Sequence, residues 1–110
     1  MRSHIIDEIR PVDMEKIIEY LNQQALVSKM KGIYWKEIPE DLYSVMQWEH
    51  KSCAPYVFAI ELGADWVKLE FFIRSLEHLS CECQAYCTSE QRAFVLNFAD
   101  RMIGECGIRT

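Results

Sequence analysis

The chain contains two apolar, strand-like segments, 56–62 and 66–74, separated by a short turn that begins with glycine. This feature constrains the fold most. A two-residue turn would place Ile60 opposite Val67, and the neighbouring cross-strand pairs would be apolar as well. Shifting the register by one residue would instead place Ile60 opposite Lys68. The sequence therefore predicts an antiparallel hairpin with one apolar face.

A third segment of alternating character, 80–87, follows a loop at 76–78. Pairing it with 66–74 would turn every second residue of the segment toward the apolar face, namely Cys81, Cys83, Ala85 and Cys87. Free cysteine packs in protein cores as a small hydrophobic residue. The pattern thus predicts a three-stranded antiparallel meander in which these cysteines belong to the core.

Helices are predicted on both sides of this meander. Residues 11–30 start with a proline and acidic residues and carry apolar side chains at helical spacing. Residues 89–106 follow Thr88 in a capping-box sequence, and 40–50 resemble a third, short helix. We expect one α+β domain over 1–110, in the order α-(α)-β-β-β-α. Its two layers would be the sheet and the N-terminal and C-terminal helices, which pack on one face.

Charge and composition exclude several functional classes. The 110 residues carry a net charge of −5, and no third of the chain is net positive, so we expect neither nucleic-acid binding nor binding to an anionic membrane. Asp7 and Glu8 interrupt any signal-peptide pattern, and no apolar run is long enough for a membrane span. The five cysteines are an odd number, which favours reduced thiols and a cytoplasmic location.

One five-residue segment that contains histidine and cysteine occurs twice in the sequence, with a single difference. Glu49-His50-Lys51-Ser52-Cys53 recurs as Glu77-His78-Leu79-Ser80-Cys81, so that each copy offers His-x-x-Cys. Imidazole and thiolate are the usual zinc ligands. In a meander the first and third strands start at the same end of the sheet, and the helix 89–106 would return the chain to that end. The candidate zinc ligands are therefore His50, Cys53, His78 and Cys81, with Cys106 as a substitute.

Two other interpretations of these residues stay open. The cysteines can be core residues, in which case no cofactor is expected. A histidine beside a cysteine can also activate the thiol, as in a thiol enzyme or a redox sensor. The sequence lacks the glycine-rich, zinc-protease and serine-hydrolase motifs of common enzymes, so enzymatic activity is not the favoured hypothesis.

The outer face of the predicted sheet carries large aromatic residues among its charges, namely Trp66, Phe72 and Tyr86. Aromatic side chains on a face without helices need a cover, which either the aromatic-rich segment 33–50 or another chain can provide. Our leading functional hypothesis is a non-enzymatic protein-association module that binds itself or another protein through these three residues. A structural zinc-binding domain is the alternative.

Overall fold

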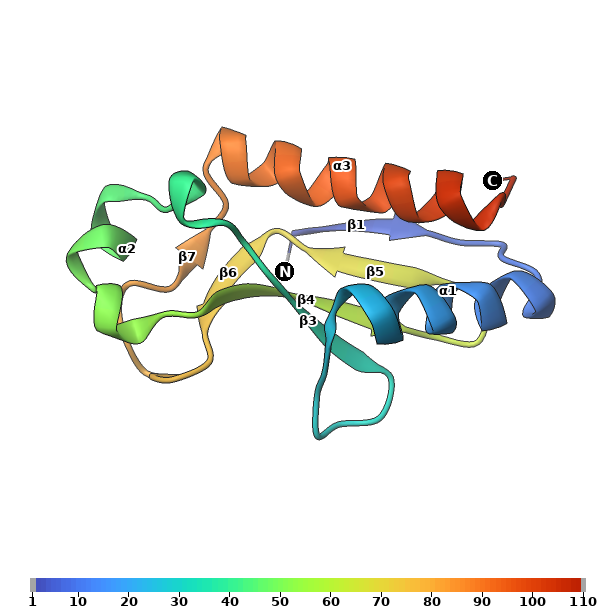
Figure 1. Ribbon diagram of the computed structural model, residues 1–110, viewed down its shortest axis with the longest axis horizontal. Helices are drawn as coiled ribbons and strands as arrows, with labels where there is room; N and C mark the ends of the chain where they lie inside the picture. The colour runs from blue at the N-terminus through green and yellow to red at the C-terminus, as the bar shows by residue number, and fades with distance from the viewer. Residues whose placement is uncertain (1, 110) are drawn as a thin grey trace.

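Seven β-strands and three α-helices make up residues 2–109, the part of the chain that the computed structural model describes (Figure 1). The strands are β1 Ser3–Ile6, β2 Leu26–Val27, β3 Ile33–Glu37, β4 Tyr56–Leu62, β5 Val67–Glu70, β6 Phe72–Ser75 and β7 Ala85–Tyr86. The helices are α1 Pro11–Gln24, α2 Val45–Glu49 and α3 Ser89–Cys106. Single turns of 3-10 helix, Glu40–Leu42 and Lys51–Cys53, lie on either side of α2.

The central hairpin forms between β4 and β5, but its register differs from the predicted one. Ile60 pairs with Leu69 rather than Val67, and Leu62 pairs with Val67. The two-residue turn therefore lies one residue later, at Ala64 and Asp65, and it is closed by a 2.9 Å hydrogen bond from the Gly63 N–H to the carbonyl of Trp66. A slip of two residues leaves every side chain on its predicted face, so Ile60, Val67 and Leu69 are fully buried.

The predicted three-stranded meander is wrong in the number and order of strands, although the antiparallel α+β class is confirmed. The main sheet has the order β1-β5-β4-β3-β2, and β6 continues along β4 and pairs with β7. Residues 3–6 and 33–37 form strands that we had not predicted, and β1 precedes the first helix. These segments are too short to show a clear period on their own, and pairing with β5 and β4 provides the stability they lack.

The predicted third strand over 80–87 is reduced to the two residues of β7. Only Ala85 and Tyr86 pair with β6. The side chain of Gln84 ends this pairing, because its Oε1 accepts a 2.9 Å hydrogen bond from the Ser75 N–H and its Nε2 donates to the carbonyl of Leu79. Residues 76–84 therefore form a loop that leaves the sheet.

Helices α1 and α3 pack on the same face of the sheet. The rings of Phe58 in β4 and Phe98 in α3 are 6.0 Å apart, while Ile17 and Leu21 of α1 are fully buried in the same core. The predicted capping box at Thr88 is confirmed. None of the helices within residues 2–109 combines the length and the apolar character that crossing a membrane requires.

The predicted helix 40–50 is shorter than expected and starts later. Ser44 and Gln47 form a second capping box, which begins α2. Gln47 is buried and accepts a 2.8 Å hydrogen bond from Gln91, which belongs to the capping box at the start of α3. Gln91 also donates to the carbonyl of Leu42. This buried contact holds α2, and with it His50, against the beginning of α3.

Candidate metal centre

Four side chains with the chemistry of zinc ligands meet at the end of the sheet where α3 begins: His50, Cys53, Cys81 and Cys83. Their donor atoms all lie within 4.8 Å of one another. Cys81 Sγ is 3.2 Å from His50 Nδ1 and 3.5 Å from Cys53 Sγ. Sulfur ligands of a tetrahedral zinc ion are ~3.8 Å apart when the Zn–S bonds are near 2.3 Å. The four donors thus have the spacing of a four-coordinate site.

The first pair of donors comes from the end of α2. His50 is the residue that ends this helix, and Cys53 ends the 3-10 turn that follows. The Cys53 N–H donates a 2.8 Å hydrogen bond to the carbonyl of His50. The buried Tyr56 hydroxyl donates to the same carbonyl, also at 2.8 Å. These bonds hold the two side chains of the His-x-x-Cys segment on one side of the turn.

The second pair comes from the loop 76–84. The Cys81 N–H donates to the carbonyl of His78, which makes a tight turn, and the Cys83 N–H points at Cys81 Sγ at 3.5 Å. A backbone N–H directed at sulfur stabilises a thiolate. The turn therefore directs two cysteines with a single residue between them toward the same point.

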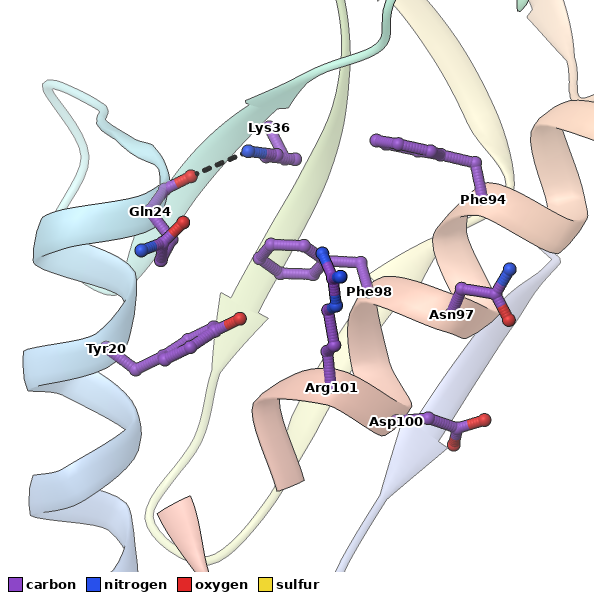
Figure 2. Close-up of a pocket in the computed structure, with 8 residues that line it drawn as sticks. All are labelled: Tyr20, Gln24, Lys36, Phe94, Asn97, Phe98, Asp100 and Arg101. Atoms are coloured by element: carbon purple, nitrogen blue, oxygen red, sulfur yellow. Dashed lines mark hydrogen bonds between the residues drawn. The ribbon is translucent and has the colours of Figure 1, made fainter. Parts of the chain in front are cut away.

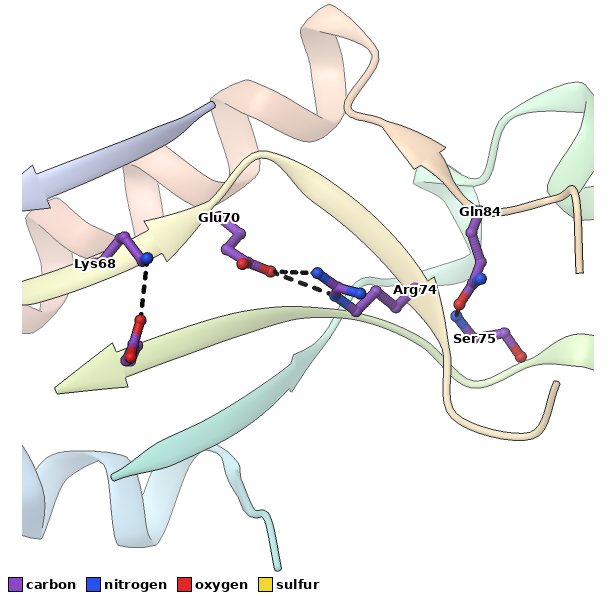
Figure 3. A network of polar contacts seen from close by, with 6 residues as sticks. Lys68, Glu70, Arg74, Ser75 and Gln84 are labelled. Carbon is purple, nitrogen blue, oxygen red and sulfur yellow. Dashed lines mark hydrogen bonds and ion pairs between the residues drawn. The ribbon is translucent and has the colours of Figure 1, made fainter. Parts of the chain in front are cut away.

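Ser75 connects the two halves of the site. Its side chain is completely buried, and its hydroxyl donates to the carbonyl of Cys53 and accepts a 2.9 Å hydrogen bond from the His78 N–H. Its own N–H is bound by Gln84, as Figure 3 shows. One residue thus contacts both the segment that carries Cys53 and the loop that carries Cys81.

Burial and mutual hydrogen bonding give the thiols of Cys53, Cys81 and Cys83 different pKa values. Cys53 and Cys83 are buried, with 5% and 1% of their surface exposed. Burial, followed by the hydrogen bond with Cys81, raises the pKa of Cys53 to about 12. Burial also raises the pKa of Cys83. Hydrogen bonds from the side chain and backbone of Cys83 lower the pKa of Cys81 to about 7. Without metal, the cluster therefore concentrates negative charge on Cys81.

The structure brings together three of the five ligands suggested by the sequence, His50, Cys53 and Cys81. His78 is exposed and lines a shallow hollow of about 580 Å³ beside Cys53 and Cys81, outside the group of four. Cys106 lies at the other end of α3, where its Sγ contacts the carbonyl of Lys16. The expected return to the site does not occur, because no full third strand carries the chain across the sheet before α3 begins (Figure 1).

Cys83 is a candidate ligand that the sequence analysis did not include. Its alternation with Cys81 was interpreted as the pattern of a strand with both cysteines in the core. Cys83 is indeed buried in contact with the core, but the loop also turns it toward the other three donors. The available signal was the Cys-x-Cys spacing itself, since neighbouring cysteines on a tight turn can share one metal ion.

The aromatic residues predicted to form an interface divide into two groups. The rings of Phe72 and Tyr86 are in edge-to-face contact at 5.3 Å, and Arg2 lies over Tyr86. Trp66 lies in the β4–β5 turn, where its indole occupies the space that a side chain at Gly63 would need.

The segment expected to cover this face does not do so. Trp35 lies in β3, opposite Ala59, and is part of the outer face itself. Tyr43 packs on Tyr56, whose side chain belongs to the helix-bearing side of the sheet.

The charged residues of the outer face pair with one another. Lys68 contacts Glu61 at 3.0 Å, and Arg74 contacts Glu70 at 3.1 Å (Figure 3). Both carboxylates are therefore engaged in ion pairs, Glu61 across the strands and Glu70 along the chain.

No protein-family model matches the chain, and no curated protein or solved structure matches it significantly.

Proposed function

We propose that this chain is a zinc-binding domain in which His50, Cys53, Cys81 and Cys83 hold one structural zinc ion. The observation that carries the proposal is the convergence of these four donor atoms within 4.8 Å of one another. They come from two segments whose nearest ligands, Cys53 and Cys81, are 28 positions apart in the chain.

The donor set favours zinc over other common metal ions. Calcium and magnesium prefer oxygen ligands, whereas three thiols and one imidazole make a Cys₃His set, which is typical of structural zinc sites. Four protein ligands fill a tetrahedral coordination sphere, so no position is left for a substrate or a reactive water. The proposed role of the metal is therefore to tie the loop 76–84 to the end of α2.

The metal content of the purified, untagged protein tests this proposal, and two matched pairs of variants test the ligand set. We expect about one zinc per chain by mass spectrometry. His50→Gln and Cys83→Ser should lower the zinc content, because each removes a donor. His78→Gln and Cys87→Ser should retain it, because neither residue belongs to the group of four.

The pairs also distinguish the two possible ligand sets. Loss of zinc in His78→Gln but not in Cys83→Ser would assign the metal to the repeated His-x-x-Cys segments instead. A well-folded protein that binds no zinc would refute the proposal and leave the cysteines as core residues. In that case the close contact of His50 with Cys81 would favour a reactive thiol, which thiol-alkylation rates would reveal.

We further propose that the chain associates with a second copy of itself through the outer face of the sheet. The observation that favours this function is the position of all three α-helices away from that face, together with the apolar side chains that it exposes. Ile5 and Leu26 at its edges are 56% and 50% exposed, and Trp35 and Phe72 are half-buried. Twofold dimers are the commonest way to cover such a face.

Sedimentation equilibrium tests this association. We expect wild-type protein to form a dimer and Phe72→Asp to be monomeric, because the new carboxylate would lose its hydration in the interface. Val45→Asp is the matched control, since Val45 is 76% exposed but lies on α2. A wild-type monomer at high micromolar concentration would refute self-association. A dimer that Phe72→Asp leaves intact would show that another surface is used.

A further inference from the structure

A hollow of about 760 Å³ lies between α1 and α3, at the opposite side of the core from the outer sheet face. Tyr20 and Gln24 line it from α1, Phe94, Phe98 and Arg101 from α3, and Lys36 from β3 (Figure 2). Its volume is within the range of ~300–1,000 Å³ found for small-molecule sites. The metal centre does not contribute to it.

Aromatic rings form the floor and one wall of this hollow. Phe98 is 7% exposed, and its ring centre is 6.0 Å from that of Tyr20. Phe58 supports Phe98 from below, again at 6.0 Å, so the floor is anchored in the core. A planar aromatic group placed on Phe98 would meet a rigid apolar surface.

Two cations stand at the rim without a carboxylate partner. Lys36 Nζ is held by a 2.9 Å hydrogen bond to the carbonyl of Gln24 and lies 5.4 Å from the Phe98 ring. Arg101 lines the same hollow from α3, and the side chain of Asp100, which also lines it, points away from the Phe98 ring (Figure 2). Among residues 2–109, neither cation forms an ion pair. The nearby Glu105 is engaged, since it accepts a hydrogen bond from the Tyr20 hydroxyl.

We propose that this hollow binds a small aromatic anion, such as an aryl carboxylate. The ring would lie on Phe98, and the carboxylate would lie between Lys36 and Arg101. Charge complementarity favours an anion, because two cations that form no ion pair among residues 2–109 line one apolar hollow in a chain whose net charge is −5. Charge-assisted hydrogen bonds from guanidinium and ammonium groups would orient the carboxylate. This inference is independent of the proposed zinc site.

Titration of the full-length protein with 2-naphthoate, followed by two-dimensional NMR, tests the inference. We expect saturable shifts confined to residues that line the hollow. The neutral isostere 2-naphthamide should bind at least ~3-fold more weakly, because it keeps the ring but loses the charge. Absence of saturable shifts at millimolar 2-naphthoate, or equal binding of the amide, would overturn the proposal.

A matched pair of arginine variants on α3 checks the position of the anion. Arg101→Gln should weaken naphthoate binding ~3- to 5-fold and leave naphthamide binding unchanged. Arg92→Gln is the control, because Arg92 lies on the same helix but over the ring of Phe71. Both arginines are exposed, so neither change should unfold the protein. An equal effect of the two variants would indicate general electrostatic attraction and overturn the assignment of the site.

Discussion

The side chains of two cysteines separated by one residue point in different directions in a strand and in a turn, so their roles differ. On a strand, Cys81 and Cys83 would point to the same face and pack beside Phe71 and Ile73. In the turn that the chain adopts, both thiols point toward Cys53 and His50. The deciding residue is Gln84, whose side chain takes the backbone N–H of Ser75 that a continuing strand would have used. The Gln84 side chain therefore favours the turn, in which the two cysteines can act as ligands, over the strand, in which they would pack in the core.

Asp13 is a second residue whose surroundings determine its role. Its carboxylate is 2% exposed and lies 2.9 Å from Arg10 Nε and 3.5 Å from Lys16 Nζ. The hydrogen bond from Arg10, more than the charge of either cation, holds the pKa of Asp13 below its usual value. A lowered pKa in the folded state means that the ionised carboxylate stabilises the fold.

This shift predicts how the stability of an Asp13→Asn variant depends on pH. The contribution of Asp13 is complete above the pKa of the unfolded chain, ~3.9, and is lost as the pH falls through the lower folded-state pKa. The variant should therefore be less stable than the wild type at pH 7, and the difference should shrink at pH 3. Urea unfolding at both pH values measures this difference, with the exposed Asp7→Asn as control. A difference that is the same at both pH values would contradict the argument.

At the scale of elements, the loop 76–84 depends on polar contacts, because it buries little apolar surface. Leu79 is 74% exposed, and of the residues in the loop only Cys83 is buried. Ser75 and Gln84 provide the hydrogen bonds that hold the loop to β6. An element of this kind opens more readily than the core unless a further link is present. The proposed zinc ion would be that link.

Ser75→Ala tests the polar attachment of the loop. The change leaves the buried carbonyl of Cys53 and the N–H of His78 without their partner. We expect a loss of ~1–3 kcal/mol in the free energy of unfolding and weaker zinc binding. Ser80→Ala is the control, because Ser80 lies exposed in the same loop. Equal stability of the two variants in urea would show that Ser75 does not hold the site together.

At the scale of the whole molecule, the candidate metal centre occupies one end of the core, where Cys53 and Cys83 are part of the buried cluster. The core lies between α1, α3 and the inner face of the sheet, and it includes Ile17, Phe58 and Met102. The metal centre lies at one end of that sheet, beyond most of this apolar surface. We therefore expect the core to stay folded without metal, unlike a small zinc finger, which unfolds.

Thermal unfolding with and without a chelator tests whether the core stays folded. Zinc at 100-fold above its dissociation constant would stabilise the folded state by ~2.7 kcal/mol, which corresponds to a rise in Tm of ~10 °C or more. Adding a chelator should lower Tm by that amount while the far-ultraviolet circular dichroism at 25 °C stays unchanged. Complete loss of helical signal on chelation would mean that the core depends on the metal.

Structural features that depend on residues close together in the chain could be predicted from the sequence. The alternation in 56–74 correctly assigned Ile60, Val67 and Leu69 to the inner face even though the register differed by two residues, because side-chain direction depends only on odd or even position. The capping box at Thr88 was predicted correctly because it depends on four neighbouring residues. The antiparallel α+β class follows from these local features.

The number of strands and the membership of the metal cluster were decided only by the tertiary structure. β1 and β3 are strands because β5 and β4 offer them hydrogen-bonding edges. Cys83 joins the cluster, and Cys106 does not, because of where the chain turns after Ser75 and which end of the sheet α3 begins at. Such choices depend on contacts between residues far apart in the chain, and a local pattern carries no information about the partner.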